Sequence, residues 1–130
     1  MKILIADDDS HIRELLRTIL IAGEHQVVEA HNGQEAWEIL QLPDAPTIAI
    51  LDWVMPEMNG PDVCRNVRKH GGLEHVYLIL ITVKHSSEDI VEGLEAGAND
   101  YVTKPFNADE IFARVNVGMQ MVTLHSALAE

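Results

Sequence analysis

Residues 2–9 read KILIADDD, so four apolar residues in succession lead directly into three aspartates. The apolar positions are consecutive rather than alternate. A β-strand with this pattern is covered on both faces, which is typical of a parallel sheet between two layers of helices. The aspartates begin where the apolar run ends. We therefore expect a buried strand that carries acidic side chains at its carboxyl end.

Similar short runs recur along the chain, separated by longer stretches in which apolar residues have helical spacing. The runs lie at residues 27–28, 48–51, 77–81 and 101–102. Each run is followed by one helical stretch, which gives five β–α units with short connections. Right-handed crossovers between such units produce one sheet with helices on both faces. The predicted fold is α/β, with a doubly wound five-stranded parallel sheet and five helices.

Residues that start and stop helices lie between these elements. We expect Ser10 to cap the first helix, with Asp9 close to its positive end. Gly23, the glycine pair at 71–72 and Gly97 are placed to end helices in the left-handed conformation that glycine tolerates.

Length, charge and cysteine content exclude several classes of protein. The 130 residues suffice for one ordinary domain, and a net charge of −12 repels phosphate backbones and anionic lipid. The single cysteine cannot form an internal disulfide. The longest largely apolar stretch, residues 76–83, is too short to span a bilayer, and the acidic residues at 7–9 interrupt any signal peptide. We expect a soluble, cytoplasmic domain that binds neither nucleic acid nor membrane.

Polar residues follow the carboxyl ends of four predicted strands, where ligands bind in parallel α/β sheets. Asp7 and Asp8 follow the first strand, Asp52 ends the third, Thr82 ends the fourth, and Lys104 follows the fifth. If the strand order is 2-1-3-4-5, the three aspartates meet in one pocket. Three carboxylates at close range need a compensating charge, which Lys104 and a bound divalent ion can supply. Oxygen ligands without nearby histidine or cysteine favour Mg²⁺.

Such a pocket is suited to attack by a carboxylate on a phosphoryl group. Asp52 would be the nucleophile and would carry the product, an acyl phosphate. Mg²⁺ would neutralise charge on the transferring oxygens, while Lys104 and Thr82 would hold the others. Each aspartate alone could instead cap a helix or begin a turn. The agreement of four strand ends favours the phosphoacceptor interpretation.

Four stretches resemble the receiver domain of two-component response regulators, in particular the chemotaxis-regulator type. They are residues 3–9 (ILIADDD), 51–60 (LDWVMPEMNG), 81–82 (IT) and 93–106 (GLEAGANDYVTKPF), and the resemblance covers residues 2 to 118. It implies a flavodoxin-like receiver fold with strand order 2-1-3-4-5. It also implies a receiver domain at residues 1–118, followed at 119–130 by an extension of the last helix that could link to an output domain.

The resemblance assigns roles to the residues of the pocket. Asp52 matches the phosphoacceptor. Asp7 and Asp8 match the acidic pair that binds Mg²⁺, and the backbone carbonyl of Val54 matches the third protein ligand. Thr82 matches the hydroxyl that turns toward the phosphoryl group when the domain is activated.

Three further roles lie at the fifth strand. Tyr101 matches the aromatic residue whose inward or outward rotamer reports activation. Lys104 matches the lysine that pairs with a phosphoryl oxygen. The bond between Lys104 and Pro105 is expected to be cis, as in the family.

Three residues depart from the family pattern. Val83 stands after the threonine, where the family usually has a small residue, and should narrow access to the phosphoryl site. Val54 is apolar where some relatives carry a polar residue that assists the attacking water. Lys84 adds a cation to the rim. We expect slow hydrolysis of the acyl phosphate and weak reaction with some small phosphodonors.

The resemblance implies a phosphorylation-controlled switch rather than an enzyme with an external substrate. A sensor histidine kinase or a phosphotransfer protein would phosphorylate Asp52, and the surface of the fourth helix, fifth strand and fifth helix would change for an output domain or partner protein. A phosphohydrolase of the haloacid dehalogenase type is disfavoured because Val54 stands where an acid is needed. A flavin carrier lacks its phosphate-binding loop after the first strand. A receiver-like domain that is no longer phosphorylated is disfavoured by the intact acceptor pocket.

The last predicted helix runs from residue 107 to the end of the chain, which is longer than one edge of the sheet requires. Val117, Met121, Leu124 and Leu128 are spaced 4, 3 and 4 residues apart, as in the seam of a short coiled coil. One interpretation is a homodimer through this helix. The other is an ordinary stripe that faces the core.

The remaining conspicuous side chains have simpler interpretations. The seven histidines show no pair at metal-ligand spacing and are expected on the solvated surface. Cys64 lies among helical apolar positions and should be a small core residue. Trp53 follows the nucleophile and should lie near the pocket, where it could report on the site.

Overall fold

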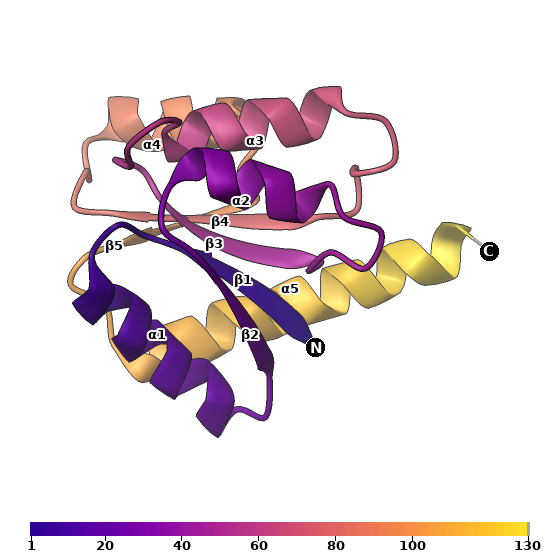
Figure 1. The fold of residues 1–130 in the computed structure, drawn as a ribbon, viewed down its shortest axis with the longest axis horizontal. Helices are drawn as coiled ribbons and strands as arrows, with labels where there is room; N and C mark the ends of the chain where they lie inside the picture. The colour runs from indigo at the N-terminus through magenta and orange to yellow at the C-terminus, as the bar shows by residue number, and fades with distance from the viewer. Residues whose placement is uncertain (130) are drawn as a thin grey trace.

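Strands and helices alternate without exception along the chain (Figure 1). The computed structural model describes residues 1–129. The elements are β1 (Lys2–Ala6), α1 (Ser10–Ala22), β2 (Gln26–Ala30), α2 (Gly33–Leu40), β3 (Ile48–Asp52), α3 (Gly60–Lys69), β4 (Tyr77–Thr82), α4 (Ser87–Glu95), β5 (Asp100–Thr103) and α5 (Ala108–Ala129). All strand pairs are parallel, in the order β2-β1-β3-β4-β5. The predicted doubly wound sheet is confirmed.

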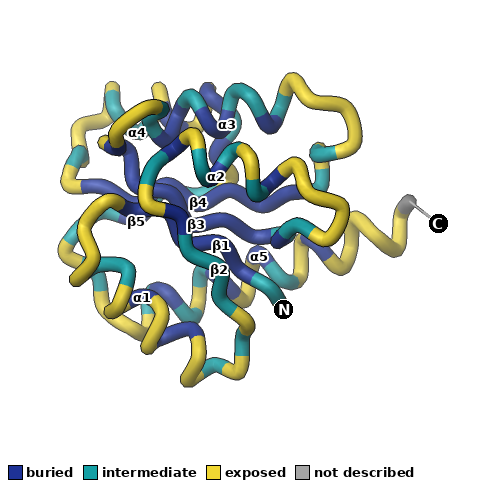
Figure 2. The backbone as a smooth tube through the Cα atoms, viewed as in Figure 1, coloured by how far each residue is buried: buried dark blue, intermediate teal, exposed yellow. Residues whose placement is uncertain are grey.

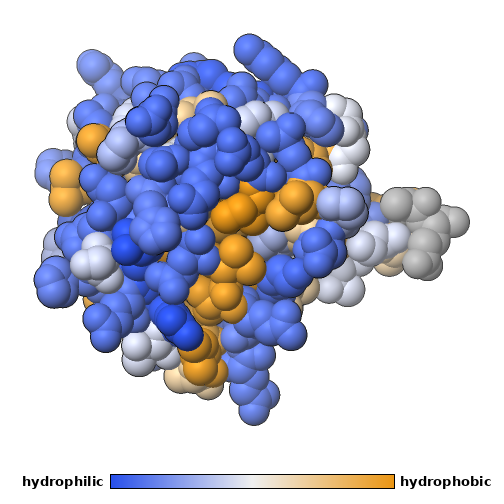
Figure 3. All heavy atoms as spheres, viewed as in Figure 1, coloured by the Kyte–Doolittle hydropathy of each residue, from blue (hydrophilic) through white to orange (hydrophobic). Residues whose placement is uncertain are grey.

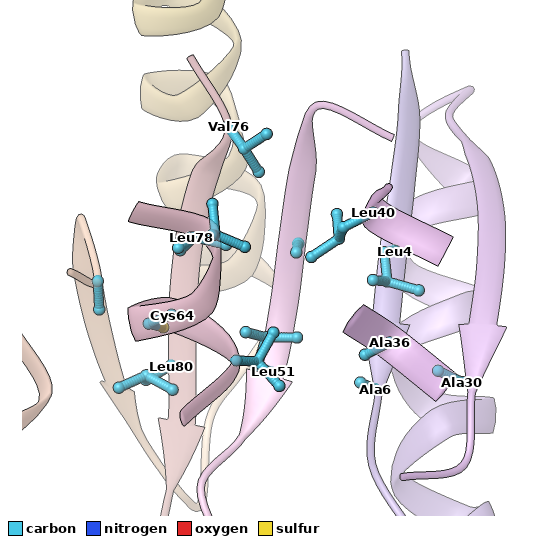
Figure 4. Packing of buried hydrophobic residues seen from close by; sticks show 14 of the residues in the cluster. Leu4, Ala6, Ala30, Ala36, Leu40, Leu51, Cys64, Val76, Leu78 and Leu80 are labelled. Atoms are coloured by element: carbon cyan, nitrogen blue, oxygen red, sulfur yellow. The ribbon is translucent and has the colours of Figure 1, made fainter. Parts of the chain in front are cut away.

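The sheet divides the apolar core into two layers, because successive side chains of a strand point to opposite faces. Leu4 of β1 joins the cluster beneath α2 and α3, whereas its neighbours Ile3 and Ile5 join the cluster beneath α1 and α5. Figure 4 shows the first of these layers, in which Leu40 of α2 lies near Leu4. Every residue of β3 and β4 is buried, as Figure 2 shows for the middle of the sheet. This explains the consecutive apolar runs in the sequence.

The edges of the sheet are less covered than its centre. β2 lies at one edge, and its Val27 and Val28 are only half-buried. On the face drawn in Figure 3, an apolar strip crosses an otherwise hydrophilic surface near this edge. Among the described residues, no helix combines the length and apolar character that a membrane crossing requires.

Two helix ends differ from the sequence-based expectation. Asp9, not Ser10, caps α1, because its carboxylate accepts a hydrogen bond from the backbone N–H of His11 at 2.9 Å. Ser10 is the first helical residue instead. Gly23 ends α1 as predicted, but its φ of −85° is not left-handed, and the positive φ of 66° falls on Glu24. Gly72 and Gly97 do adopt positive φ, at 92° and 121°.

The long last helix packs on the sheet with a face other than its 4-3-4 seam. Ile111, Val115 and Val122 of α5 are buried in the core. The seam residues are exposed, with 46, 50, 53 and 78% of the surface of Val117, Met121, Leu124 and Leu128 accessible. The interpretation of the seam as a core-facing stripe is therefore wrong. Figure 1 shows the end of α5 running beyond the sheet.

Candidate functional site

The buried polar side chains of the described chain gather at the edge of the sheet that is formed by the carboxyl ends of its strands. Asp7, Asp52 and Thr82 are the buried polar or charged residues among residues 1–128, at 0, 7 and 1% exposure. They stand at the carboxyl ends of β1, β3 and β4. Because apolar residues fill the rest of the core, this edge is where the fold retains buried polar groups, each of which needs a partner.

Three carboxylates converge at this edge. β1 and β3 are neighbours and Ala6 pairs with Leu51. The next residues on the two strands, Asp7 and Asp52, therefore lie side by side. Asp7, Asp8 and Asp52 each offer an oxygen within 4.8 Å of the others, and the described residues contain no other such group of three metal-ligating side chains. Asp8 is exposed and opens the group to solvent. An all-oxygen donor set with an open side fits Mg²⁺, which keeps several waters.

Lys104 supplies a positive charge to the same pocket. Its Nζ lies 3.1 Å from Asp7 Oδ2 and 3.4 Å from Asp52 Oδ1. The backbone N–H of Lys104 donates to the carbonyl of Thr82 at 2.8 Å, and its bond to Pro105 is cis. The ammonium group therefore lies between the two buried carboxylates.

Burial and charge act in opposite directions on the proton affinities of the pocket. Burial and, to a smaller extent, the neighbouring Asp7 raise the pKa of Asp52, Lys104 partly opposes both, and the resulting pKa is about 6. Burial lowers the pKa of Lys104, but Asp52 and Asp7 outweigh burial and leave it raised. Lys104 therefore stays protonated, while Asp52 is ionised above about pH 6.

Local backbone contacts hold the acidic residues in place. The N–H of Asp9 donates to Asp7 Oδ1 at 2.9 Å, and Arg13 Nη1 donates to the carbonyl of Asp7 at 2.7 Å. The loop after Asp52 closes through a 2.8 Å hydrogen bond from the N–H of Gly60 to Trp53. A Cβ at position 60 would lie 2.4 Å from the carbonyl oxygen of Asp52, so this position requires glycine. The role of Arg13 was not anticipated, because its position on α1 gave no signal of a contact with Asp7.

The residues matched to the switch form a connected group beside the pocket. Thr82 Oγ1 accepts a 3.3 Å hydrogen bond from the N–H of Lys84, and the hydroxyl of Tyr101 donates to the carbonyl of Lys84 at 2.8 Å. Burial, with Asp89 and Glu92, raises the pKa of Tyr101 to about 12, so the hydroxyl keeps the proton that it donates.

Trp53 belongs to the same group, as its position in the sequence suggested. It packs edge-to-face against Tyr101 with ring centroids 6.2 Å apart, and Lys84 Nζ lies 5.4 Å from the centroid of its ring. The side chains of Val54 and Val83 point toward solvent, at 64 and 67% exposure. Lys84 thus contacts the indole beside the pocket, in the position of a cation–π pair.

Other side chains singled out in the sequence lie apart from this pocket. Cys64 is buried in the core as predicted, and burial raises the pKa of its thiol to about 12. The histidines are exposed or half-buried, as expected, but two of them are not scattered. His75 and His125 lie together with ring centroids 5.9 Å apart, although 50 residues separate them. His25 has a buried ring nitrogen, and burial lowers its pKa.

Comparison with known proteins agrees with the fold. The response regulator receiver domain model matches residues 3–116, and the chain belongs to this family. Members of the family are signalling switches of two-component systems, not turnover enzymes on external substrates.

Similar proteins include stand-alone receivers and longer regulators. Chemotaxis protein CheY1 of Helicobacter pylori is 36% identical over 118 residues, covering 90% of this chain and 95% of that protein. Response regulator MprA of Mycobacterium avium is 39% identical over 115 residues, covering 88% of this chain and 49% of that protein.

Solved structures of a receiver domain and of a longer regulator are also similar to this chain. The receiver domain of the Francisella response regulator 1452 superposes with a TM-score of 0.84 at 31% identity, covering 92% of this chain and 96% of that one. A probable two-component response regulator with a GGDEF domain gives a TM-score of 0.86 at 27% identity, covering 95% of this chain and 50% of that one.

Proposed function

We propose that this receiver domain accepts a phosphoryl group on Asp52 from a sensor histidine kinase or a phosphotransfer protein, with Mg²⁺ bound. The observation that carries the proposal is the convergence of Asp7, Asp8, Asp52 and Lys104 at one edge of the sheet. Asp7, Asp8, Asp52 and the backbone carbonyl of Val54 would hold the ion. When bound, Mg²⁺ neutralises charge on the phosphoryl oxygens during transfer.

The chemistry of the step follows from the protonation states of the pocket. An ionised oxygen of Asp52 attacks the phosphorus, the new O–P bond forms, and the N–P bond to the donor histidine breaks as that histidine leaves. Lys104 is protonated and already lies between Asp7 and Asp52, so it can pair with a phosphoryl oxygen. Asp52 has to be ionised for attack, which its pKa of about 6 allows at neutral pH.

The same proposal includes a conformational response. Phosphorylation brings further charge and acceptor oxygens to Asp52, and the hydroxyl of Thr82 turns toward them. Lys84 then moves with Thr82, because its backbone N–H bonds to Thr82 and its carbonyl accepts from Tyr101. Rearrangement of Tyr101 alters the α4–β5–α5 surface, which controls an output domain or a partner protein.

The acyl phosphate is lost by slow autodephosphorylation, in this proposal. Val54 and Val83 flank the acceptor and the threonine, and neither can hydrogen-bond an attacking water. Their branched side chains are exposed and closely follow Asp52 and Thr82 in the chain. Both features favour a long-lived phosphorylated state and weak reaction with small donors.

We also propose that residues 1–118 form the receiver and that residues 119–130 extend the last helix and link it to an output domain; residue 130 of this range lies outside the described residues. MprA and the GGDEF-domain protein are each about twice as long as the part matched by this chain. The exposed 4-3-4 seam would join two copies in a homodimer. We also propose that the protein is cytoplasmic. We propose that this segment contacts neither nucleic acid nor membrane, which its net charge of −12 supports.

The switch can be followed through Trp53. In a Trp37→Phe background, Trp53 is the one remaining indole, and it contacts both Tyr101 and Lys84. We expect its fluorescence emission to change on phosphorylation. The change should persist in Thr82→Ser but be smaller in Thr82→Ala, and intact mass verifies that each variant is phosphorylated. An equal change in Thr82→Ala would remove Thr82 from the switch. No change in any phosphorylated variant would refute the proposed response.

A further inference from the structure

Two histidine side chains meet at the opposite end of the sheet from Asp52. His75 precedes β4 at its amino end, and His125 lies on the exposed end of α5. Their ring centroids are 5.9 Å apart and their planes are tilted by 34°. Glu74 is adjacent in the chain and exposed. The fold therefore brings two imidazoles together from distant parts of the chain, and Glu74 precedes one of them in the sequence.

These residues border a cavity of about 170 Å³. Its lining also includes Tyr77 and Asn99, together with Met121, Leu124 and Leu128 of α5. The side-chain oxygen of Asn99 is already occupied, because it accepts from Arg68 at 2.7 Å and from the N–H of Leu78 at 2.8 Å. Arg68 also donates to the backbone carbonyl of Glu74 at 3.3 Å, so backbone and amide oxygens hold its guanidinium at this end of the sheet. The cavity has room for an ion with several waters, each of which takes about 30 Å³.

The separation of the two rings fits a shared ion. A zinc–nitrogen bond is about 2.0–2.1 Å long, which places two imidazole centroids on one tetrahedral ion about 5 Å apart. The observed 5.9 Å is within about 1 Å of this value, a change that side-chain rotation supplies. Glu74 does not converge with both rings. Its exposed carboxylate accepts hydrogen bonds from the backbone of Glu74 and Gly72, which lower its pKa, and it has to leave them to reach a shared ion.

We propose that His75 and His125, with Glu74 as third ligand, form a site for a borderline transition-metal ion such as Zn²⁺. Imidazole nitrogens select such ions, whereas the all-oxygen cluster around Asp52 favours Mg²⁺. The two sites therefore differ in chemistry as well as in place. A bound ion would tie the end of α5 to the loop before β4 and fix the direction in which the helix leaves the domain. This inference is independent of phosphorylation at Asp52.

The test is a calorimetric titration of the tag-free chain with Zn²⁺ in excess Mg²⁺, which occupies the carboxylate cluster. We expect one Zn²⁺ per chain, with at least tenfold weaker binding in His75→Ala and in His125→Ala. His31→Ala is the matched control, because His31 also lies beside a carboxylate, with its Nδ1 3.2 Å from Glu35 Oε1, but has no second imidazole. Its affinity should equal that of the parent chain.

Sedimentation at the end of the titration distinguishes a site within one chain from a bridge between chains. One ion bound per monomer supports the proposal. Three results would overturn it. The first is one ion per two chains, the second is binding that is unchanged in His75→Ala and His125→Ala, and the third is an absence of Zn²⁺ binding in excess Mg²⁺. Far-ultraviolet circular dichroism of each variant establishes that a lost signal reflects lost ligands, not unfolding.

Discussion

The ammonium group of Lys104 lies 3.1 Å from Asp7, a residue 97 positions earlier in the chain. Lys104 follows β5 at one edge of the sheet, and Asp7 follows β1 on the far side of β3 and β4. The lysine thus reaches across two strand ends, and the contact forms only when the whole sheet is assembled. It makes the acidic pocket a property of the tertiary fold rather than of any single segment.

Removing Lys104 should destabilise the domain because two buried carboxylates would lose their shared cation. In metal-free buffer, we expect Lys104→Ala to lower the free energy of unfolding by about 1–3 kcal/mol at pH 8. The loss should be smaller near pH 5, where Asp52 can take up a proton. Urea denaturation at both values measures this difference.

Lys2→Ala is the control for Lys104→Ala. It removes an exposed ion pair with Asp44, at 3.5 Å, and should cost under about 1 kcal/mol. If Lys104→Ala has the same small effect at both pH values, Lys104 does not neutralise the pocket.

The raised pKa of Asp52 predicts a pH dependence of stability. The pKa of this carboxyl is about 6 in the folded protein, against a usual value of 3.8. The folded state therefore holds the proton more tightly, so the stability from this group is complete below about pH 4 and is lost as the pH rises through about 6. Without metal, Asp52→Asn should remove this dependence and be more stable above pH 7, by on the order of 1 kcal/mol.

Thermal unfolding of Asp52→Asn and of the parent chain in chelator measures this effect across the pH range. Asp44→Asn is the control, because Asp44 is highly exposed and its substitution should leave the profile unchanged. A parent profile that is flat between about pH 4 and 7, or parallel to that of Asp52→Asn, would contradict the raised pKa.

The side chain after Thr82 should limit access to the acceptor. We expect Val83→Ala to accelerate phosphorylation by a small phosphodonor, and hydrolysis of the acyl phosphate, by several-fold each, because it removes a branched side chain beside the pocket. Loss of phosphorylated protein with time, followed by mass, gives both rates. Val91→Ala, which truncates an exposed valine on α4, should change neither rate. A phosphoryl lifetime of seconds in the parent chain would show that Val83 offers no protection.

The exposed seam of α5 should mediate dimerisation. We expect sedimentation to show a concentration-dependent dimer that Val117→Glu with Leu124→Glu abolishes, since like charges would then face each other across the seam. Asn116→Glu with Thr123→Glu adds the same charge to other exposed positions of the helix and should leave the dimer largely intact. A monomer at all concentrations, with and without a phosphoryl mimic, would count against the seam.

The sequence sufficed for the fold and for the members of the pocket because both depend on short patterns. Consecutive apolar residues identified β1, β3 and β4, and their polar ends supplied Asp7, Asp52 and Thr82. The edge strands β2 and β5 gave shorter runs, since each is covered less fully than the centre.

Features that depend on side-chain direction or on distant contacts could not be predicted in this way. The choice of Asp9 over Ser10 as cap is decided by which oxygen meets the N–H of His11. The outward seam of α5 follows from the docking of Ile111 and Val115 on the sheet. The pairing of His75 with His125 arises because α5 passes the amino end of β4, which no spacing in the sequence reveals.

The intact mass of the chain after incubation with Mg²⁺ and a phosphodonor tests the central claim most directly. A histidine kinase should serve as donor if a small molecule reacts too slowly, as Val83 predicts. We expect the mass of one phosphoryl group to be added, and to be absent in Asp52→Asn and after removal of Mg²⁺. No addition from either donor, or equal addition to Asp52→Asn, would contradict the assignment of Asp52 as the phosphoacceptor.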